Sequence, residues 1–172
     1  MKGIAVIGPF VVLLAACGVT SGGTLTQTPT AVTQTSTSAT PTPDLQAQAA
    51  QAYQAAANAF NQVDDSVNAT LAALPSSAPW SDVVPSAQDL LTANEAFDTA
   101  MFAIQFPAQD QADVSALLKS VEVEIADLQA IVSDSSEATW TTYGTDSTTS
   151  AGDSNAVRHD LGLAPVPVPT SS

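Results

Sequence analysis

Acidic side chains are the residues of this chain whose spacing could support chemistry. Asp113, Glu124, Asp127 and Asp134 fall along one flank of a predicted helix. Carboxylates on facing helices bind paired iron ions in some bundles, but those sites also need Glu-x-x-His pairs. The chain has one histidine, His159, and no Glu-x-x-His. The spacing therefore predicts a charged, solvated helix face and no metal ligands.

A second group of residues could suggest nucleophilic chemistry. Gly152-Asp153-Ser154 resembles the nucleophile segment of trypsin-like serine proteases. Those enzymes place the serine, histidine and acid on separate elements of a β-barrel, whereas His159 follows Ser154 by only five residues. The sequence also has no P-loop, dinucleotide-binding fingerprint, Cys-x-x-Cys or EF-hand pattern. We therefore predict no catalytic residues, no cofactor and no enzymatic activity.

Two polar residues occupy positions where apolar ones are expected. Asp64 interrupts the apolar stripe between Phe60 and Val67, and Asn94 interrupts the stripe of the following helix. A buried polar group without a partner costs roughly 1 to 3 kcal/mol. We therefore predict that Asp64 meets Asn94 or Arg158 in a buried polar layer that fixes the helix register. The alternative is that Asp64 edges the stripe and reaches water.

Four stretches of the chain have the apolar spacing of amphipathic helices. Apolar residues recur at steps of three and four over residues 44–74, 83–105, 110–134 and 137–161. Helices joined by short loops pack as antiparallel neighbours. The sequence therefore predicts an all-α, antiparallel up-down four-helix bundle over residues 44–164. A three-helix core with a loosely docked carboxy-terminal segment is the alternative.

The predicted helix ends rest on capping residues. Thr42 is the expected cap of the first helix, with Pro43 at its first position, and Asp110 is the expected cap of the third. Gly162 should adopt the left-handed conformation after the fourth helix, with Leu163 packing back. The Pro-rich tail, residues 165–172, should be extended.

The fourth helix has the weakest pattern. Threonine, serine and glycine are frequent over residues 141–152, and they have low helix propensity. We therefore expect its first half to be irregular or kinked. Three aromatic residues lie in the most irregular parts of the folded region: Trp80, Trp140 and Tyr143. We predict that they close the ends of the core; the alternative is that they line a binding patch.

The amino terminus has the pattern of an export signal. Lys2 precedes a short apolar run that ends at Leu14-Ala15-Ala16-Cys17. This run is shorter than the roughly 20 apolar residues that cross a bilayer. The four residues resemble the lipobox of bacterial lipoproteins, which implies that residues 1–16 are a cleaved signal peptide and that Cys17 is lipidated. The alternative is an ordinary secretory signal that is cut slightly later.

The segment that follows Cys17 has the composition of a spacer. Residues 18–43 contain no charged side chain and are rich in threonine and proline. We predict that residues 17–43 form a lipid-anchored, disordered linker, because such a stretch has too few large apolar groups to fold. As a random coil it would span about 30 Å.

A second resemblance concerns the helical region. Arg158-His159-Asp160-Leu161-Gly162-Leu163, followed by proline, is similar to a segment of uncharacterised actinobacterial lipoproteins with helical cores. This resemblance implies the fold class and carries no known activity.

Charge limits the partners of the chain. Its 172 residues have a formal net charge of −14, which becomes −15 when Lys2 leaves with the signal peptide. Such an acidic protein is not built to attract nucleic acid. We expect a non-catalytic interaction or structural module of the cell envelope, lipid-anchored on the extracytoplasmic face of the membrane and contacting an envelope protein. The alternative is an accessory lipoprotein of a transport system that binds a ligand or metal ion.

Overall fold

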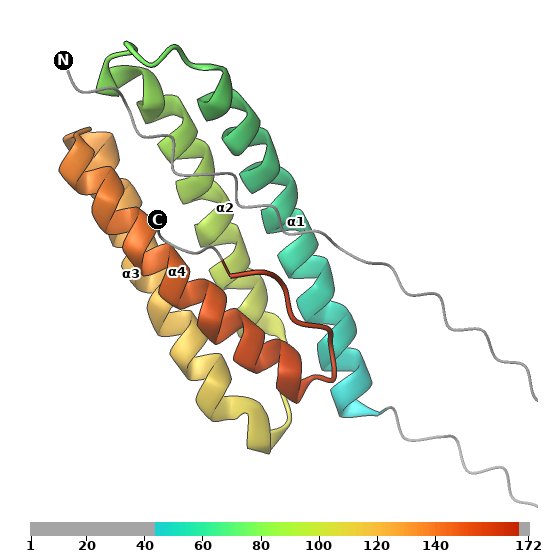
Figure 1. The fold of residues 1–172 in the computed structure, drawn as a ribbon. Helices are drawn as coiled ribbons and strands as arrows, with labels where there is room; N and C mark the ends of the chain where they lie inside the picture. Colours follow the sequence, from blue (N-terminus) through green and yellow to red (C-terminus); the bar gives the residue numbers. More distant parts are fainter. Residues whose placement is uncertain (1–43, 169–172) are drawn as a thin grey trace, which may run out of the picture.

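The computed structural model describes residues 44–168, which form four long α-helices joined by short loops (Figure 1). The predicted signal peptide, Cys17 and the linker lie outside the described residues. Two 3-10 turns, Trp80–Val83 and Ala108–Asp110, precede the second and third helices. The helices are α1 (Leu45–Ala73), α2 (Val84–Ala103), α3 (Gln111–Ser133) and α4 (Glu137–Asp160).

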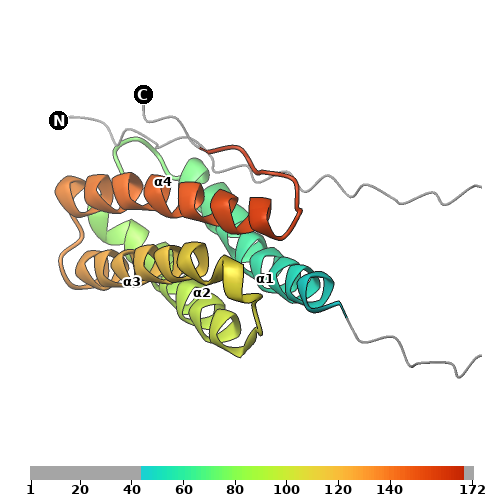
Figure 2. The same ribbon diagram turned by 90° about the horizontal axis from the view of Figure 1, so that it is seen from below.

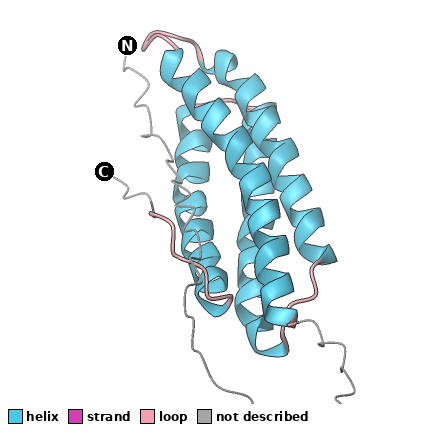
Figure 3. Cartoon of the chain, turned by 90° about the vertical axis from the view of Figure 1, so that its right-hand side faces the viewer, coloured by secondary structure: helices cyan, strands magenta, loops and turns pink. Residues whose placement is uncertain are grey.

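The helices run alternately up and down, so the predicted all-α, antiparallel four-helix bundle is confirmed (Figure 1). Each helix packs against the next one along the chain, and α3 and α4 lie side by side (Figure 2). Within residues 44–168 no strand forms (Figure 3). No helix in this part of the chain is both long and apolar enough to cross a membrane.

Side chains connect α1 to α4, the two helices farthest apart along the chain. The Tyr53 hydroxyl lies 2.7 Å from the Ser154 hydroxyl. Near the end of α4, the Gln46 Nε2 atom donates a hydrogen bond to the carbonyl oxygen of Asp160 at 2.8 Å. These contacts close the bundle along the side where the backbones approach least.

Two of the predicted caps are wrong in detail. The α1 helix is capped by Asp44, whose carboxylate accepts a hydrogen bond from the backbone nitrogen of Gln46 at 3.1 Å, and not by Thr42. Asp110 precedes α3 as expected, but its carboxylate forms no capping bond. That side chain is buried instead, and its Oδ2 atom has no partner within the described residues.

The expected irregularity of α4 is also wrong, because α4 is a continuous helix from Glu137 to Asp160. A capping box between Ser136 and Thr139 starts it. Burial of Trp140, Tyr143 and Val157 in the core outweighs the low intrinsic propensity of the sequence. Four threonine hydroxyls within α4 also donate to carbonyl oxygens four residues earlier: those of Thr141, Thr142, Thr145 and Thr148.

The same packing excludes a three-helix core with a loose fourth segment. The α4 helix contributes buried aromatic and aliphatic side chains to both halves of the core. It ends as predicted, because Gly162 has a φ of 70° and Leu163 packs back onto the core. The backbone nitrogen of Leu163 donates to the Arg158 carbonyl oxygen at 2.7 Å. The tail that follows has no regular secondary structure through Val168.

The apolar core consists of two separate clusters. One lies around Tyr53, Leu117 and Val157, and the other lies around Val67, Leu128 and Trp140. Between them each helix contributes at least one buried polar residue: Asp64 on α1, Asn94 on α2, Glu124 on α3, and Ser147 and Ser150 on α4. The bundle therefore has a polar layer within its apolar interior.

Candidate functional site

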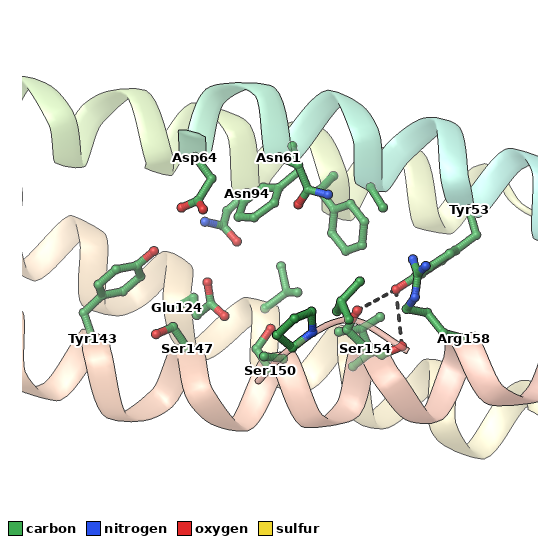
Figure 4. Close-up of a pocket in the computed structure, with 18 residues that line it drawn as sticks. Tyr53, Asn61, Asp64, Asn94, Glu124, Tyr143, Ser147, Ser150, Ser154 and Arg158 are labelled. Carbon is green, nitrogen blue, oxygen red and sulfur yellow. Dashed lines mark hydrogen bonds between the residues drawn. The ribbon is translucent and has the colours of Figure 1, made fainter. Parts of the chain in front are cut away.

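A cavity of about 100 Å³ lies inside the bundle and includes this polar layer (Figure 4). All four helices and the carboxy-terminal tail supply its walls. The volume is large enough for several water molecules or a small organic molecule. Its polar lining consists of Tyr53, Asn61, Asp64, Asn94, Glu124, Tyr143, Ser147, Ser150, Ser154 and Arg158.

One end of the cavity is acidic. Asp64 and Glu124 are 8% and 4% exposed, and they come from α1 and α3. Asn94, which is 1% exposed, lies beside Asp64, and their polar groups face one another in Figure 4. The Asn68 Nδ2 atom donates to Asp64 Oδ2 at 3.0 Å. No lysine or arginine pairs with Asp64 or Glu124 within residues 44–168.

Burial changes the titration of both acids. It raises the pKa of Asp64 from 3.8 to about 7, and the charge of Asp65 adds to this while the hydrogen bond from Asn68 opposes it. Burial likewise raises the pKa of Glu124 from 4.5 to about 7. Hydrogen bonding to Ser150 opposes that rise, and the charge of Asp64 adds to it. Both acids therefore change protonation near neutral pH.

Tyr143 extends from α4 into the acidic end of the cavity (Figure 4). Its side chain is only 7% exposed, and its hydroxyl has no hydrogen-bond partner among residues 44–168. Burial and the charge of Glu124 raise its pKa well above 10. The hydroxyl is therefore a neutral, unpaired group, free to donate or accept a hydrogen bond inside the cavity.

The other end of the cavity is basic. Arg158 is 6% exposed and forms no ion pair with a carboxylate in the described part of the chain. Its Nε atom donates to the carbonyl oxygen of Ala164 at 2.6 Å. The Tyr53 hydroxyl, next to it, lies 2.7 Å from the Ser154 hydroxyl. Burial raises the pKa of Tyr53, although the charge of Arg158 opposes the rise.

Residues 164–167, here called the C-terminal strap, cover one side of the cavity. Val166 and Pro167 are part of its lining. The Asn155 side chain bonds both backbone groups of Val166, and Arg158 bonds Ala164. The strap is therefore attached to α4 by side chains that lie next to the cavity.

The predicted polar layer corresponds to this cavity only in part. The structure brings Asp64 and Asn94 together, and both are buried, so Asp64 does not simply edge the stripe. Arg158 lines the same cavity at its opposite end, beside Tyr53, and is not the partner of Asp64 (Figure 4). That this layer fixes the helix register stays a prediction.

Glu124 is the residue that the sequence analysis misplaced. The sequence predicts that the acids of α3 form a solvated face. Asp134 is exposed, as predicted, but Glu124 is buried. A signal for this was present in the sequence. Glu124 follows Val121 by three residues and precedes Leu128 by four, which is the spacing of the inner stripe of α3.

Two other acids of α3, Asp113 and Asp127, lie against acids of α4. Asp113 contacts Asp160, and this contact adds to burial in raising the pKa of Asp113. Asp127 contacts Asp146 in the same way, so that burial and Asp146 raise the pKa of Asp127 to about 6. The two acids of each pair repel one another when both are ionised, and this repulsion favours protonation of one of them.

The protease-like segment does not form a catalytic site. The Ser154 hydroxyl forms a hydrogen bond with the Tyr53 hydroxyl, while the His159 side chain is 90% exposed and lies beside Asp160.

The aromatic residues singled out in the sequence lie in or against the core. Trp140 and Tyr143 pack edge to face, with ring centroids 5.8 Å apart, and Trp80 packs against the same cluster.

Within the described residues, no group of three or more His, Cys, Asp or Glu side chains is placed to hold a metal ion. No protein-family model, curated protein or solved structure matches the chain.

Proposed function

We propose that this chain is a lipid-anchored protein of the extracytoplasmic membrane face whose helical bundle binds a small polar molecule in its interior. The observation that carries the proposal is the cavity between the two apolar clusters, with buried acids at one end and a buried arginine at the other. Its polar groups come from all four helices and are thus held on rigid elements.

The energetics of the cavity support ligand binding over a purely structural role. Burial of a charge without a partner opposes folding, and an apolar side chain of similar size would be equally or more stable there. Asp64, Glu124 and Arg158 are each buried without an ion pair among residues 44–168. A ligand that pairs with these groups would recover the lost interactions on binding.

The proposed location rests on the amino-terminal sequence. Leu14-Ala15-Ala16-Cys17 resembles a lipobox, and residues 18–43 could hold the bundle away from the lipid surface. An anchored binding protein of this kind would act as an accessory of a transport system, concentrating a ligand at the membrane. This proposal develops the alternative from the sequence analysis, in which an interaction module of the envelope came first.

The proposal includes no catalytic role. Two nucleophilic groups lie at the basic end, the Tyr53 and Ser154 hydroxyls. They form a hydrogen bond with each other, and His159 is exposed. At the acidic end, the Ser147 hydroxyl donates within α4. Burial and the charge of Glu124 raise the pKa of Tyr143 well above 10, so its hydroxyl stays protonated and is a weak nucleophile. Binding is therefore the activity that this arrangement supports.

Thermal-shift measurements and calorimetry on the full-length mature chain in detergent test the binding function. The panel should contain small amines, carboxylates, zwitterions, neutral alcohols and divalent metal ions. We expect at least one class to raise the melting temperature and to bind with a stoichiometry of one. Absence of binding by every class would overturn the proposal and favour the interaction module, which pull-down from envelope extracts would then address.

A further inference from the structure

We infer that the ligand is a small organic monocation whose ammonium group lies between the carboxylates of Asp64 and Glu124; this inference rests on the ligand-binding function proposed above. The two acids project into one cavity from different helices, and Asn94 and Tyr143 complete that end (Figure 4).

Within residues 44–168, no side chain supplies the positive charge that would balance these acids. Residues 44–168 contain only two side chains that are cationic at every physiological pH, Lys119 and Arg158. Lys119 is exposed on α3, and Arg158 lies at the other end of the cavity, bonded to Ala164. The only side-chain hydrogen bond that Asp64 accepts is from Asn68, which is neutral.

The free polar groups at the acidic end match the needs of an ammonium group. An ammonium group has three donors and no acceptor. Asn94 uses its Nδ2 atom to bond the carbonyl oxygen of Leu90 at 3.1 Å, which leaves its oxygen available. The Tyr143 side chain is 7% exposed and directed into the cavity, and its hydroxyl is unpaired within the described residues. These groups and the two carboxylates supply acceptors for all three donors.

The remaining walls suit the carbon skeleton of such a ligand. Phe60 and Phe97 line the cavity with ring centroids 6.0 Å apart, and Ala57 and Val121 add aliphatic surface. Aromatic faces also attract organic cations. A volume of about 100 Å³ limits the ligand to a few non-hydrogen atoms.

Arg158 restricts the charge of the ligand. Its guanidinium lies at the far end of the same cavity and would repel a second ammonium group. A linear diamine is thus disfavoured, and a ligand with a neutral or anionic far end is favoured. A divalent metal ion fits less well, because only two carboxylates meet at the acidic end, and no group of three or more His, Cys, Asp or Glu side chains in residues 44–168 is placed to hold a metal ion.

The test uses calorimetry with the full-length mature chain near pH 8, where both acids are ionised. The probes are n-butylamine, putrescine, sodium butyrate, n-butanol and calcium chloride. We expect n-butylamine to bind with a stoichiometry of one and to bind more tightly than the other four. Asp64→Asn and Glu124→Gln should each weaken it by about tenfold or more. The matched controls Asp89→Asn on α2 and Glu122→Gln on α3, both at exposed positions, should leave affinity unchanged.

A measurement on the unmodified chain keeps the test valid if a variant fails to fold. Addition of n-butylamine should shift the NMR signals of the Asn94 side-chain amide and leave those of Asn155, at the strap, nearly unchanged. Lack of a shift at Asn94 in the presence of bound amine would overturn the proposed site.

The remaining outcomes separate this inference from the function on which it rests. If butyrate, butanol, calcium or putrescine binds more tightly than n-butylamine, the assignment of a monocationic ligand is wrong, whereas the binding function still stands. Amine binding that is equal in the cavity and control variants would overturn the assigned acids. If none of the probes binds but another compound class in the wider panel does, only the inference fails. If no compound of any class binds, both fail.

Discussion

Asn155 holds both backbone polar groups of Val166: its Nδ2 atom donates to the Val166 carbonyl oxygen, and its Oδ1 atom accepts from the Val166 nitrogen, each at 2.8 Å. In a β-sheet, a neighbouring strand would bond the backbone groups of such an extended segment. Here a single side-chain amide does so. Because Val166 and Pro167 also line the cavity, this pairing connects the position of the strap to access to the site.

Substitution of Asn155 should loosen the strap without unfolding the bundle. Asn155→Ala removes two hydrogen bonds, each worth about 0.5 to 1.5 kcal/mol, so we expect a loss of about 1 to 2 kcal/mol in unfolding free energy. Hydrogen exchange should accelerate at residues 164–168, while the core of α4 stays protected. The control is Thr149→Ala, an exposed site on the same helix. Unchanged exchange at Val166 in Asn155→Ala would contradict this account.

Two glycines near the end of the chain should respond in opposite ways to the same substitution. Gly152 lies inside α4, and an added Cβ there meets no atom within 4 Å. Gly152→Ala should therefore stabilise the protein by about 0.5 to 1 kcal/mol through helix propensity. Gly162 has a φ of 70°, so Gly162→Ala should destabilise it by about 1 kcal/mol.

Urea denaturation monitored by circular dichroism measures both changes on the same background. Because each variant adds one methyl group, hydrophobicity is matched between them. Destabilisation by Gly152→Ala would mean that α4 is not a regular helix at this point in solution.

The bundle architecture could be predicted because apolar periodicity alone determines it. Stripes such as Tyr53 to Val67 on α1 and Val114 to Leu128 on α3 require burial, and short loops leave antiparallel packing as the simplest solution. The continuity of α4 could not be predicted this way. Its serine, threonine and glycine residues disfavour helix locally, and contacts of Trp140 and Val157 with distant segments reverse that preference.

The candidate site was predictable only where a single helix carries the signal. Asp64 and Asn94 are each out of place in their own stripe, and this identified them as buried. Which helices bring them together depends on interhelical register, which local periodicity does not encode. For this reason the sequence leaves Asn94 and Arg158 as alternative partners of Asp64, and in the structure Arg158 lies at the other end of the cavity. The burial of Glu124 is harder to predict, because Glu124 also fits an acidic flank with Asp113, Asp127 and Asp134, although its spacing from Val121 and Leu128 is that of the inner stripe.

The proposed anchor predicts a chemical modification at one residue. Cys17 is the only cysteine of the chain, so any thiol-linked lipid must be attached there. After growth of an expressing bacterium with alkyne-labelled palmitate, the protein should carry the label and sediment with membranes. Cys17→Ala should lose the label and leave the membrane fraction. An unlabelled, freely secreted protein would instead support an ordinary signal that is cut later.

The stability of the bundle should decrease as pH rises from about 4 to about 7. Asp64 and Glu124 ionise near 4 in an unfolded chain, whereas their pKa in the folded protein is about 7. In this interval the folded state binds more protons than the unfolded state, so raising the pH favours unfolding. Asp127, whose folded pKa is about 6 beside Asp146, acts in the same direction.

Removal of a buried carboxylate should reverse part of this loss. Three pKa units correspond to about 4 kcal/mol per group as an upper limit, so we expect Asp64→Asn to gain roughly 1 to 4 kcal/mol near pH 8 and little near pH 4. Asp89→Asn, at an exposed position on α2, should retain the pH dependence of the unmodified chain. The measurement is unfolding free energy by urea denaturation across pH 4 to 8. A flat or rising profile for the unmodified chain would contradict this prediction. Because an ammonium group favours the ionised acids, n-butylamine should flatten the falling profile if it binds between them.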